Sequence, residues 1–301
     1  MLFTMIEIAC EHKTQLGEGP VWDEQKNILY WVDIAKGIIH ELNVLSGKHA
    51  SYTIGQLTGA IALCNNNDLL VAAQKGPGIF NTHKHSFIQQ PPPYPATTAN
   101  RFNDGKCDAA GRFWLGTMAL DEKKAAGSLF CMTEDFTFRK MLPHLTIPNG
   151  MAWTSDNKIF YFIDTPAFAV MAYDFDLATA QISNPRKVIT IKEKEGAPDG
   201  MTIDKEGMLW IAHWDGWQVT RWDPETGAQL LSVRLPVARV TSCTFGGPAL
   251  SDLYITTACD RLNPDQYNAQ PHAGALFVWS NSGFTGMPAN RFQTKHVLPA
   301  I

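Results

Sequence analysis

The sequence predicts an all-β fold, and two features of its repeats support this expectation. A short motif that joins a polar residue to glycine returns along the chain, at residues 17–20, 103–105, 148–151 and 198–201. A hydrophobic segment rich in aromatic residues follows each motif, as expected for a buried β-strand. No part of the chain shows a sustained helical period that would compete with this pattern.

The spacing of the motif predicts the number of repeats. One oxygen-bearing residue stands at the equivalent place in each motif: Glu18, Asn103, Asn149 and Asp199. The last three are roughly 45–50 residues apart, and Glu18 precedes Asn103 by about two such intervals. Two weaker units begin near Gly59 and Thr241, which gives six in all. Units of this length with several short strands are typical of propeller blades, so we expect residues 1–301 to form one six-bladed β-propeller domain.

The strands can be placed in order along the chain. Residues 1–8 lack the basic start and the cleavage site of a signal peptide, and we expect a first strand there. Strand pairs joined by turns of Asp, Gly or Pro are clearest at residues 28–33 with 37–43 and at residues 210–213 with 218–222. A last strand is expected at residues 275–279. Together with the N-terminal strand, it is expected to complete the blade that closes the ring.

Composition excludes several classes of protein. The hydrophobic content of 45%, with 9 Trp and 16 Phe, is ample for a core, and the net charge of −4 provides no basic surface for nucleic acid. No apolar run approaches the roughly 18 residues of a membrane span. The six cysteines are scattered without a CxxC pair, which is typical of reduced thiols. We expect a cytoplasmic protein that binds neither nucleic acid nor membrane and has no obligate protein partner.

The repeated polar residues predict a metal site. The innermost strand of each blade lines the central channel, so equivalent positions in different blades face one another. Glu18, Asn149 and Asp199 would then converge, with Asn103 close by. Two carboxylates and an amide oxygen match a divalent cation, with Ca²⁺ as the first expectation and Zn²⁺, Mn²⁺, Mg²⁺ or Fe²⁺ as alternatives. Asp199 could both bind this ion and accept a proton from a bound water. The simpler alternative, stronger for any one of these residues taken alone, is that they serve turns.

Two charged residues flank this set. Arg101 lies two residues before Asn103, so both side chains share a face if the segment is extended, and its N–H donors suit substrate hydroxyls or a carboxylate. The alternative for Arg101 is an ion pair with Asp104 or Asp121. Asp104 is expected to orient its neighbours from behind the ligands. A structural role is expected for the acidic residues that stand a few positions before the hairpin strands: Asp23, Asp108, Asp156 and Asp204.

With these residues in hand, the chain resembles the regucalcin (senescence marker protein) and gluconolactonase family over nearly its whole length. The resemblance rests on residues 16–22, 101–106, 147–150, 198–201 and 241–247. It implies a six-bladed propeller with one divalent metal in the channel, held by Glu18, Asn149 and Asp199. It also implies substrate contacts at Arg101 and Asn103, Asp199 as the base, and hydrolysis of sugar lactones to aldonic acids.

One loop departs from the family pattern. Family members often carry Glu in the loop after residues 116–119, where it meets substrate, whereas this chain has Leu120 and Asp121. Asp121 is therefore assigned to the substrate-binding set, and sugar preference is expected to differ.

Three functions compete. The first is a metal-dependent sugar lactonase. The second is a non-catalytic, calcium-binding regulatory propeller, and the third is a scaffold for protein partners. Against the calcium-binding role, the chain has no EF-hand loop and Arg101 would have no purpose. Against the scaffold, the chain has no WD40 signature, and its polar residues are expected at the channel rather than on an outer rim. We therefore favour the lactonase.

Overall fold

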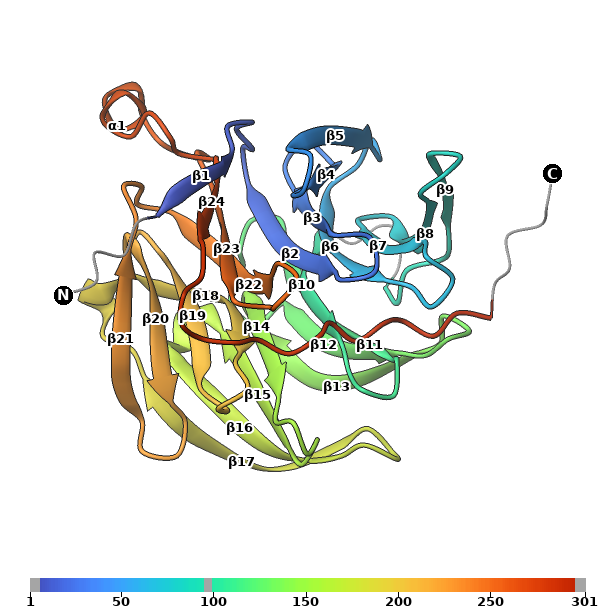
Figure 1. The fold of residues 1–301 in the computed structure, drawn as a ribbon. Helices are drawn as coiled ribbons and strands as arrows, with labels where there is room; N and C mark the ends of the chain where they lie inside the picture. The colour runs from blue at the N-terminus through green and yellow to red at the C-terminus, as the bar shows by residue number, and fades with distance from the viewer. Residues whose placement is uncertain (1–5, 95–98, 296–301) are drawn as a thin grey trace.

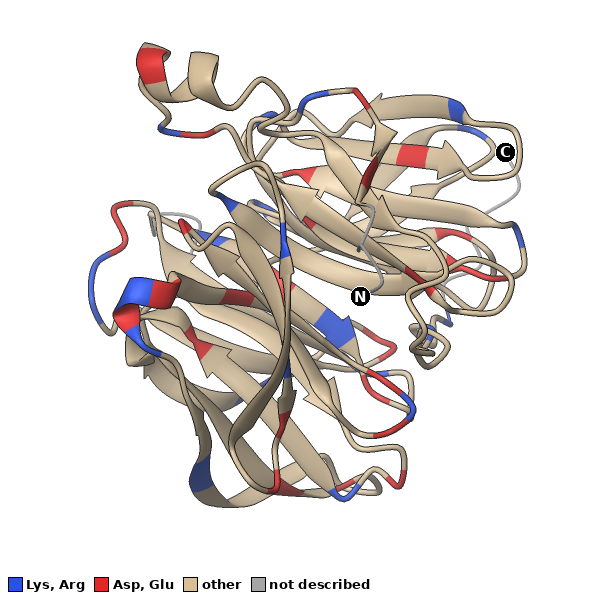
Figure 2. Cartoon of the chain, turned by 60° about the vertical axis from the view of Figure 1, so that its left-hand side comes forward, with Lys and Arg blue, Asp and Glu red and all other residues tan. Residues whose placement is uncertain are grey.

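The structure is a computed structural model that describes residues 6–94 and 99–295. It shows a six-bladed β-propeller, and the fold class expected from the sequence is confirmed (Figure 1). Each of the six sheets contains four antiparallel strands. Figure 2 shows acidic and basic residues interspersed over loops and strand ends, in keeping with the mild net charge of −4.

The first five blades follow one another along the chain. Blade one contains β2 (Gly17–Asp23), β3 (Ile28–Asp33), β4 (Ile38–Asn43) and β5 (Lys48–Thr53). Blade two contains β6 (Thr58–Leu63), β7 (Leu69–Ala73), β8 (Gly76–Asn81) and β9 (Ser86–Gln89). Blade three contains β10 (Asn100–Cys107), β11 (Phe113–Ala119), β12 (Gly127–Met132) and β13 (Phe138–Leu145). Blade four contains β14 (Pro148–Trp153), β15 (Ile159–Asp164), β16 (Ala169–Asp176) and β17 (Gln181–Thr190). Blade five contains β18 (Ala197–Ile203), β19 (Leu209–Trp214), β20 (Gln218–Asp223) and β21 (Ala228–Arg234).

Blade six joins the two ends of the chain. It is built from β22 (Val240–Gly246), β23 (Asp252–Thr257), β24 (Leu276–Trp279) and β1 (Glu7–Cys10), with β1 paired to β24. The expectation that the N-terminal strand and the strand near residue 275 share the closing blade is confirmed. The first strand lies slightly later than expected, and residues 1–5 lie outside the described residues.

Helical structure is confined to connections between strands. The helix α1 (Pro264–Ala269) lies in the long connection between β23 and β24, and its N-terminus is closed by a capping box of Asn263 and Gln266. Two 3₁₀ turns, η1 (Thr165–Ala167) and η2 (Glu193–Glu195), follow β15 and β17. None of the helices within residues 6–94 and 99–295 has the length and apolar character that a membrane crossing needs.

Aromatic residues on the inner two strands of the blades fill the core between neighbouring blades. Trp22, Trp114 and Trp210 are all 1% exposed or less. Two of these indoles are anchored by buried carboxylates, because Trp114 Nε1 donates to Asp108 Oδ2 and Trp210 Nε1 donates to Asp204 Oδ2, both at 2.9 Å. Burying an unpaired indole N–H would cost free energy, so these contacts stabilise the blade core.

The other acidic residues before hairpin strands also bond to the fold. Asp23 Oδ1 accepts from Arg291 Nη2 at 2.7 Å, and exposed Asp156 accepts from Thr154 Oγ1 at 2.6 Å within its own turn. The structural role expected for Asp23, Asp108, Asp156 and Asp204 agrees with these contacts.

The six innermost strands surround the central channel. They are β2, β6, β10, β14, β18 and β22, and each contacts the next around the ring, with β22 closing against β2. All six begin at the same end of the channel, which we call the mouth. Figure 1 shows the C-terminal segment running below the inner strands. This segment is held there by Phe292, whose N–H donates to Leu63 O at 2.7 Å, so the channel is covered at the end opposite the mouth.

Candidate metal and substrate site

The expected site residues lie at the mouth ends of four inner strands. Glu18, Asn103, Asn149 and Asp199 belong to β2, β10, β14 and β18, and all are 7% exposed or less. In each strand the pairing register shifts at or beside the site residue. Such a β-bulge breaks the alternation of side chains and re-aims one of them. The bulges therefore explain how polar residues in buried strands can be directed into the channel.

The glycines that follow the site residues allow close contact between strands. A Cβ on Gly150 would lie 2.5 Å from Met201 Cβ, and a Cβ on Gly200 would lie 2.2 Å from Ser242 Oγ. Both glycines lie inside strands without a positive φ. The alternative that Asn149 and Asp199 serve turns is therefore wrong, because the motif marks the packing of neighbouring inner strands.

A chain of amide hydrogen bonds joins blade three to blade four. Asn103 Nδ2 donates to Asn149 Oδ1 and to Pro148 O, each at 2.9 Å. Asn149 Nδ2 donates to Thr165 Oγ1 at 2.8 Å, and Thr165 Oγ1 donates to Pro198 O at 2.7 Å. Thr165 was missed by sequence reasoning because it stands in the η1 turn, outside the repeated motif. These bonds fix the Asn149 amide so that its oxygen faces Asn103.

Arg101 contacts Asn103, as expected for two side chains on the same face of an extended segment. Its Nη1 donates to Asn103 Oδ1 at 2.6 Å and to Phe102 O at 3.0 Å. The two carboxylates weighed as ion-pair partners bond elsewhere. Asp104 Oδ1 accepts from Gly105 N at 2.7 Å, and Asp121 Oδ1 accepts from Lys123 N at 3.2 Å. Within residues 6–94 and 99–295, the Arg101 guanidinium thus keeps its Nε and Nη2 donors for other acceptors.

The structure places Asp121 on the rim. It is exposed in the turn after β11, whereas Glu18, Asn149 and Asp199 are buried. Its contact with substrate stays a prediction.

The carboxylates in the channel repel one another. Burial raises the pKa of Glu18 to about 8, and nearby Asp104 adds to the shift, while the Gly19 N–H and Arg101 oppose it. Burial also raises the pKa of Asp199 well above its ordinary value, with further contributions from Glu18 and Asp104. Negative charge is therefore costly here. A divalent cation would offset that cost.

The donor set fits a hard divalent cation. Glu18 and Asp199 supply carboxylate oxygens from blades one and five, and Asn149 supplies an amide oxygen from blade four. Among residues 6–94 and 99–295, no group of three His, Cys, Asp or Glu side chains is arranged to hold a metal ion. A metal ion bound here would therefore need the amide oxygen of Asn149 as its third ligand, with Asp104 as a neighbour of the set.

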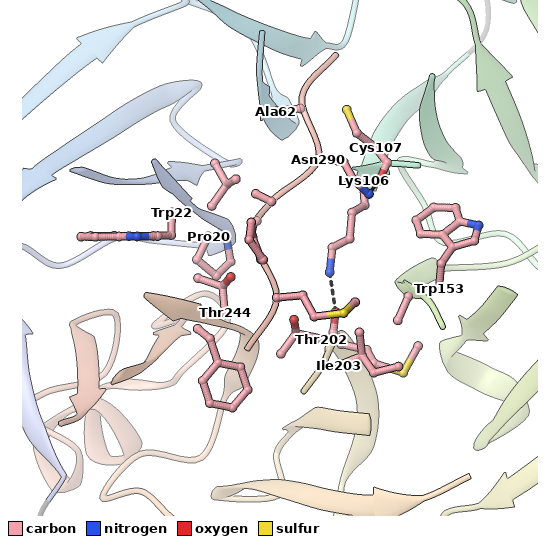
Figure 3. A pocket seen from close by; sticks show the side chains of 18 of the residues that line it. Pro20, Trp22, Ala62, Lys106, Cys107, Trp153, Thr202, Ile203, Thr244 and Asn290 are labelled. Carbon is pink, nitrogen blue, oxygen red and sulfur yellow. Dashed lines mark hydrogen bonds between the residues drawn. The ribbon is translucent and has the colours of Figure 1, made fainter. Parts of the chain in front are cut away.

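A cavity of about 350 Å³ occupies the channel beyond the site. Its lining begins one residue after Glu18 and two residues after Asp199, and it ends at residues 287–290 of the C-terminal segment. Lys106 reaches across this cavity, and its Nζ donates to Met201 O at 2.7 Å (Figure 3). Burial lowers the pKa of Lys106, and Asp104 opposes the shift. Lys106 thus ties β10 to β18 below Asp199, a role that sequence reasoning missed.

Comparisons with known proteins agree with this architecture. A sequence model described as "SMP-30/Gluconolactonase/LRE-like region" matches residues 16–259. Regucalcin of Oryctolagus cuniculus is 38% identical over 288 residues, covering 94% of this chain and 96% of that protein. Regucalcin of Gallus gallus is 36% identical over 292 residues, covering 95% of this chain and 98% of that protein.

Solved structures show the same fold. A luciferin-regenerating enzyme superposes with a TM-score of 0.91 at 30% identity, covering 96% of this chain and 99% of that one. A calcium-binding protein, regucalcin, from Agrobacterium tumefaciens has a TM-score of 0.89 at 26% identity, with 95% and 96% covered. A gluconolactonase from Xanthomonas campestris shares the fold at 19% identity. Its TM-score is 0.74, and the match covers 91% of this chain and 88% of that one. The chain belongs to the SMP-30/gluconolactonase/LRE-like family.

Proposed function

We propose that this protein is a metal-dependent hydrolase that opens sugar lactones to aldonic acids. The observation that carries the proposal is the position of Arg101. Its guanidinium is bonded to Asn103, and burial lowers its pKa while Glu18 and Asp199 oppose that shift. Arg101 is half-buried, and its Nε and Nη2 have no hydrogen-bond acceptor among the described residues. Such a cation beside two carboxylates suits recognition of a polar substrate. The gluconolactonase named in the description of the matching family model supports the same function.

Each site residue has a role in this proposal. Glu18, Asn149 and Asp199 hold one divalent ion, with Ca²⁺ as the first expectation. When bound, such an ion polarises a carbonyl and lowers the pKa of water. Asp199 accepts a proton from a water whose oxygen bonds to the lactone carbonyl carbon. The ring C–O bond then breaks, and the proton held by Asp199 passes to the ring oxygen, which becomes the alcohol of the aldonic acid. Arg101 donates to the substrate through Nε and Nη2.

Asn103 acts mainly by position. Both of its amide hydrogens are already donated, to Pro148 O and Asn149 Oδ1, so toward substrate it offers an acceptor oxygen alone. Asp104 and Lys106 balance charge beneath the ligands. Asp121 is proposed as a contact on the rim. The proposal requires no nucleic acid, membrane or protein partner.

Lactone hydrolysis before and after chelation tests this function. The panel contains glucono-, galactono-, xylono- and arabinonolactone with several divalent metals. We expect turnover of at least one lactone, its loss in EDTA and its recovery with metal. Asp156→Asn, in an exposed turn, serves as the control and should match wild type. Turnover that is unchanged in EDTA contradicts the metal-dependent mechanism, and no turnover of any lactone with metal restored contradicts the lactonase.

A calcium-binding role without turnover is the second candidate. The specific observation in its favour is that a structural relative at 26% identity is described as a calcium-binding protein, regucalcin. Tight calcium binding by the wild type together with no hydrolysis of the panel would favour it.

We also propose a cytoplasmic location. All six cysteines are free, and burial raises the pKa of each thiol. Such thiols are mostly unreactive and suit a reducing compartment.

A further inference from the structure

Two loops from opposite blades meet at the mouth of the channel. The loop of residues 120–126 follows β11 in blade three, and the loop of residues 258–275 follows β23 in blade six. Both lie at the mouth, because Ala119 pairs with Asn100 and Thr257 pairs with Val240, where the inner strands begin. Contacts between successive inner strands put blade three diametrically opposite blade six.

One ion pair bridges these loops. Arg261 Nη2 donates to Glu122 Oε1 at 2.5 Å, across 139 positions in the chain. Because its partners stand on opposite blades, this contact spans the mouth. Neither residue belongs to the repeated motif, and the proposed reaction uses neither.

Each partner is held by its own blade. Arg261 Nε lies 3.3 Å from Asp260 Oδ2, and Asp260 Oδ1 accepts from Gln15 Nε2 at 2.9 Å. Glu122 N donates to Ala119 O at 3.0 Å. Glu122 and Arg261 have φ values of 55° and 56°, a left-handed conformation that is unfavourable for a non-glycine residue. The two loops are thus held in unfavourable backbone conformations that bring these side chains together.

The bridge lies within electrostatic reach of the substrate site. Glu122 favours the charged form of Arg101, and Arg261 opposes it. The bridge is also weak, because the side chains of Arg261 and Glu122 are 63% and 38% exposed, and exposed ion pairs contribute little to stability. A contact of this strength can open as substrate enters and close again afterwards.

We propose that the Glu122–Arg261 ion pair is a gate that determines which lactones enter the channel. The inference rests on the proposed lactonase function and names its substrate class, which is compact lactones rich in hydroxyl groups. A hydroxylated ring can exchange hydrogen bonds with the charged groups as it passes beneath them. A long alkyl substituent would have to hold the pair apart without replacing its hydrogen bonds, which is unfavourable.

Variants of either partner test the gate by selectivity. Glu122→Ala and Arg261→Ala are compared with wild type on gluconolactone and on a lactone that carries a long alkyl chain. We expect the ratio of kcat/KM for the alkyl lactone to that for gluconolactone to rise by about two- to fivefold in both variants, because an exposed ion pair can hold the mouth closed by no more than that factor. The charge-swapped double variant Glu122→Arg/Arg261→Glu should restore much of the wild-type ratio. Asp174→Asn, which removes a similarly exposed ion pair with Arg186 in blade four, is the matched control and should leave the ratio unchanged.

Hydrogen exchange provides a second readout that needs no turnover. Removing Glu122 should speed exchange in residues 258–275, and removing Arg261 should speed exchange in residues 120–126. Each variant should therefore loosen a loop on the opposite blade. Unchanged exchange in the opposite loop, or an unchanged selectivity ratio in an active enzyme, would overturn the gate. A wild-type protein that opens no lactone but shows the exchange coupling would contradict the proposed function and leave the bridge between the loops established.

Discussion

The Asn103 amide donates to Asn149 Oδ1 at 2.9 Å and thereby joins an inner strand of blade three to the expected metal ligand of blade four. Its second hydrogen goes to Pro148 O at the same distance. On the opposite side, Thr165 accepts from the Asn149 amide nitrogen. The orientation of one ligand therefore depends on two residues that are not ligands themselves, a common arrangement at metal sites.

We predict that Asn103→Ala weakens metal binding by about 10–100-fold and lowers kcat/KM by a similar factor. The substitution frees Asn149 to rotate and removes one hydrogen bond to Pro148 O. Thr165→Val, which loses the bond on the other side of Asn149, should act in the same direction. Calorimetric metal titration and lactone kinetics provide the two measurements. Wild-type metal affinity in both variants would show that Asn149 needs no support.

Glu18→Ala and Asp199→Ala are predicted to abolish measurable turnover while leaving the fold intact. Each removes a metal ligand, and the second also removes the proposed proton acceptor. Circular dichroism checks the fold, and calorimetry checks metal binding. Either variant retaining more than about a hundredth of the wild-type kcat would contradict its assignment, since a general base contributes about 10²–10⁴-fold.

Arg101→Leu is predicted to raise KM more than it weakens metal binding. Arg101 contacts Asn103 through one nitrogen and has donors left for substrate, so its loss removes substrate contacts first. Comparison of KM with the metal dissociation constant for wild type and variant separates the two effects. A metal affinity that falls further than KM rises would assign Arg101 to support of the metal site.

The raised pKa of Glu18 predicts how stability of the metal-free protein depends on pH. Its folded-state pKa of about 8 lies above the ordinary value of about 4.3. Between these values the folded state holds a proton that the unfolded state has released. Stability contributed by this group is therefore present at low pH and is lost as pH rises toward about 8. Asp199, whose pKa is also raised, acts in the same direction.

Glu18→Gln should accordingly flatten this dependence. In EDTA, the Tm of wild type should fall more steeply between pH 5 and about pH 8 than the Tm of the variant. Adding Ca²⁺ at the upper end should raise the Tm of wild type more than that of the variant, because binding to the folded state stabilises it. Parallel curves for the two proteins in EDTA would show that the pKa of Glu18 is not raised in the metal-free folded state.

The sequence was sufficient to predict the fold and the placement of four polar residues at one end of the channel. Glu18, Asn103, Asn149 and Asp199 recur at a blade-length spacing, and one strand per blade must line the channel. The topology then places these four residues at the same end of the channel. The direction of their side chains could not be predicted, because it depends on the bulges in the inner strands and on the contacts of Gly150 and Gly200 with neighbouring blades.

Contacts outside the repeat were not predictable from the sequence. Thr165 stands in a 3₁₀ turn, and Lys106 bonds to the backbone of another blade at Met201. The Glu122–Arg261 pair requires left-handed backbone at two non-glycine residues. No local pattern encodes such conformations, since they are imposed by the loops around them.

Anomalous diffraction from a crystal soaked in Mn²⁺ would show whether Glu18, Asn149 and Asp199 hold one metal ion. We expect one strong peak in the channel, with oxygens of these three residues at roughly 2.0–2.6 Å from it. A fully ordered channel with no peak there, or a peak that lies beyond bonding distance of these three side chains, would contradict this assignment.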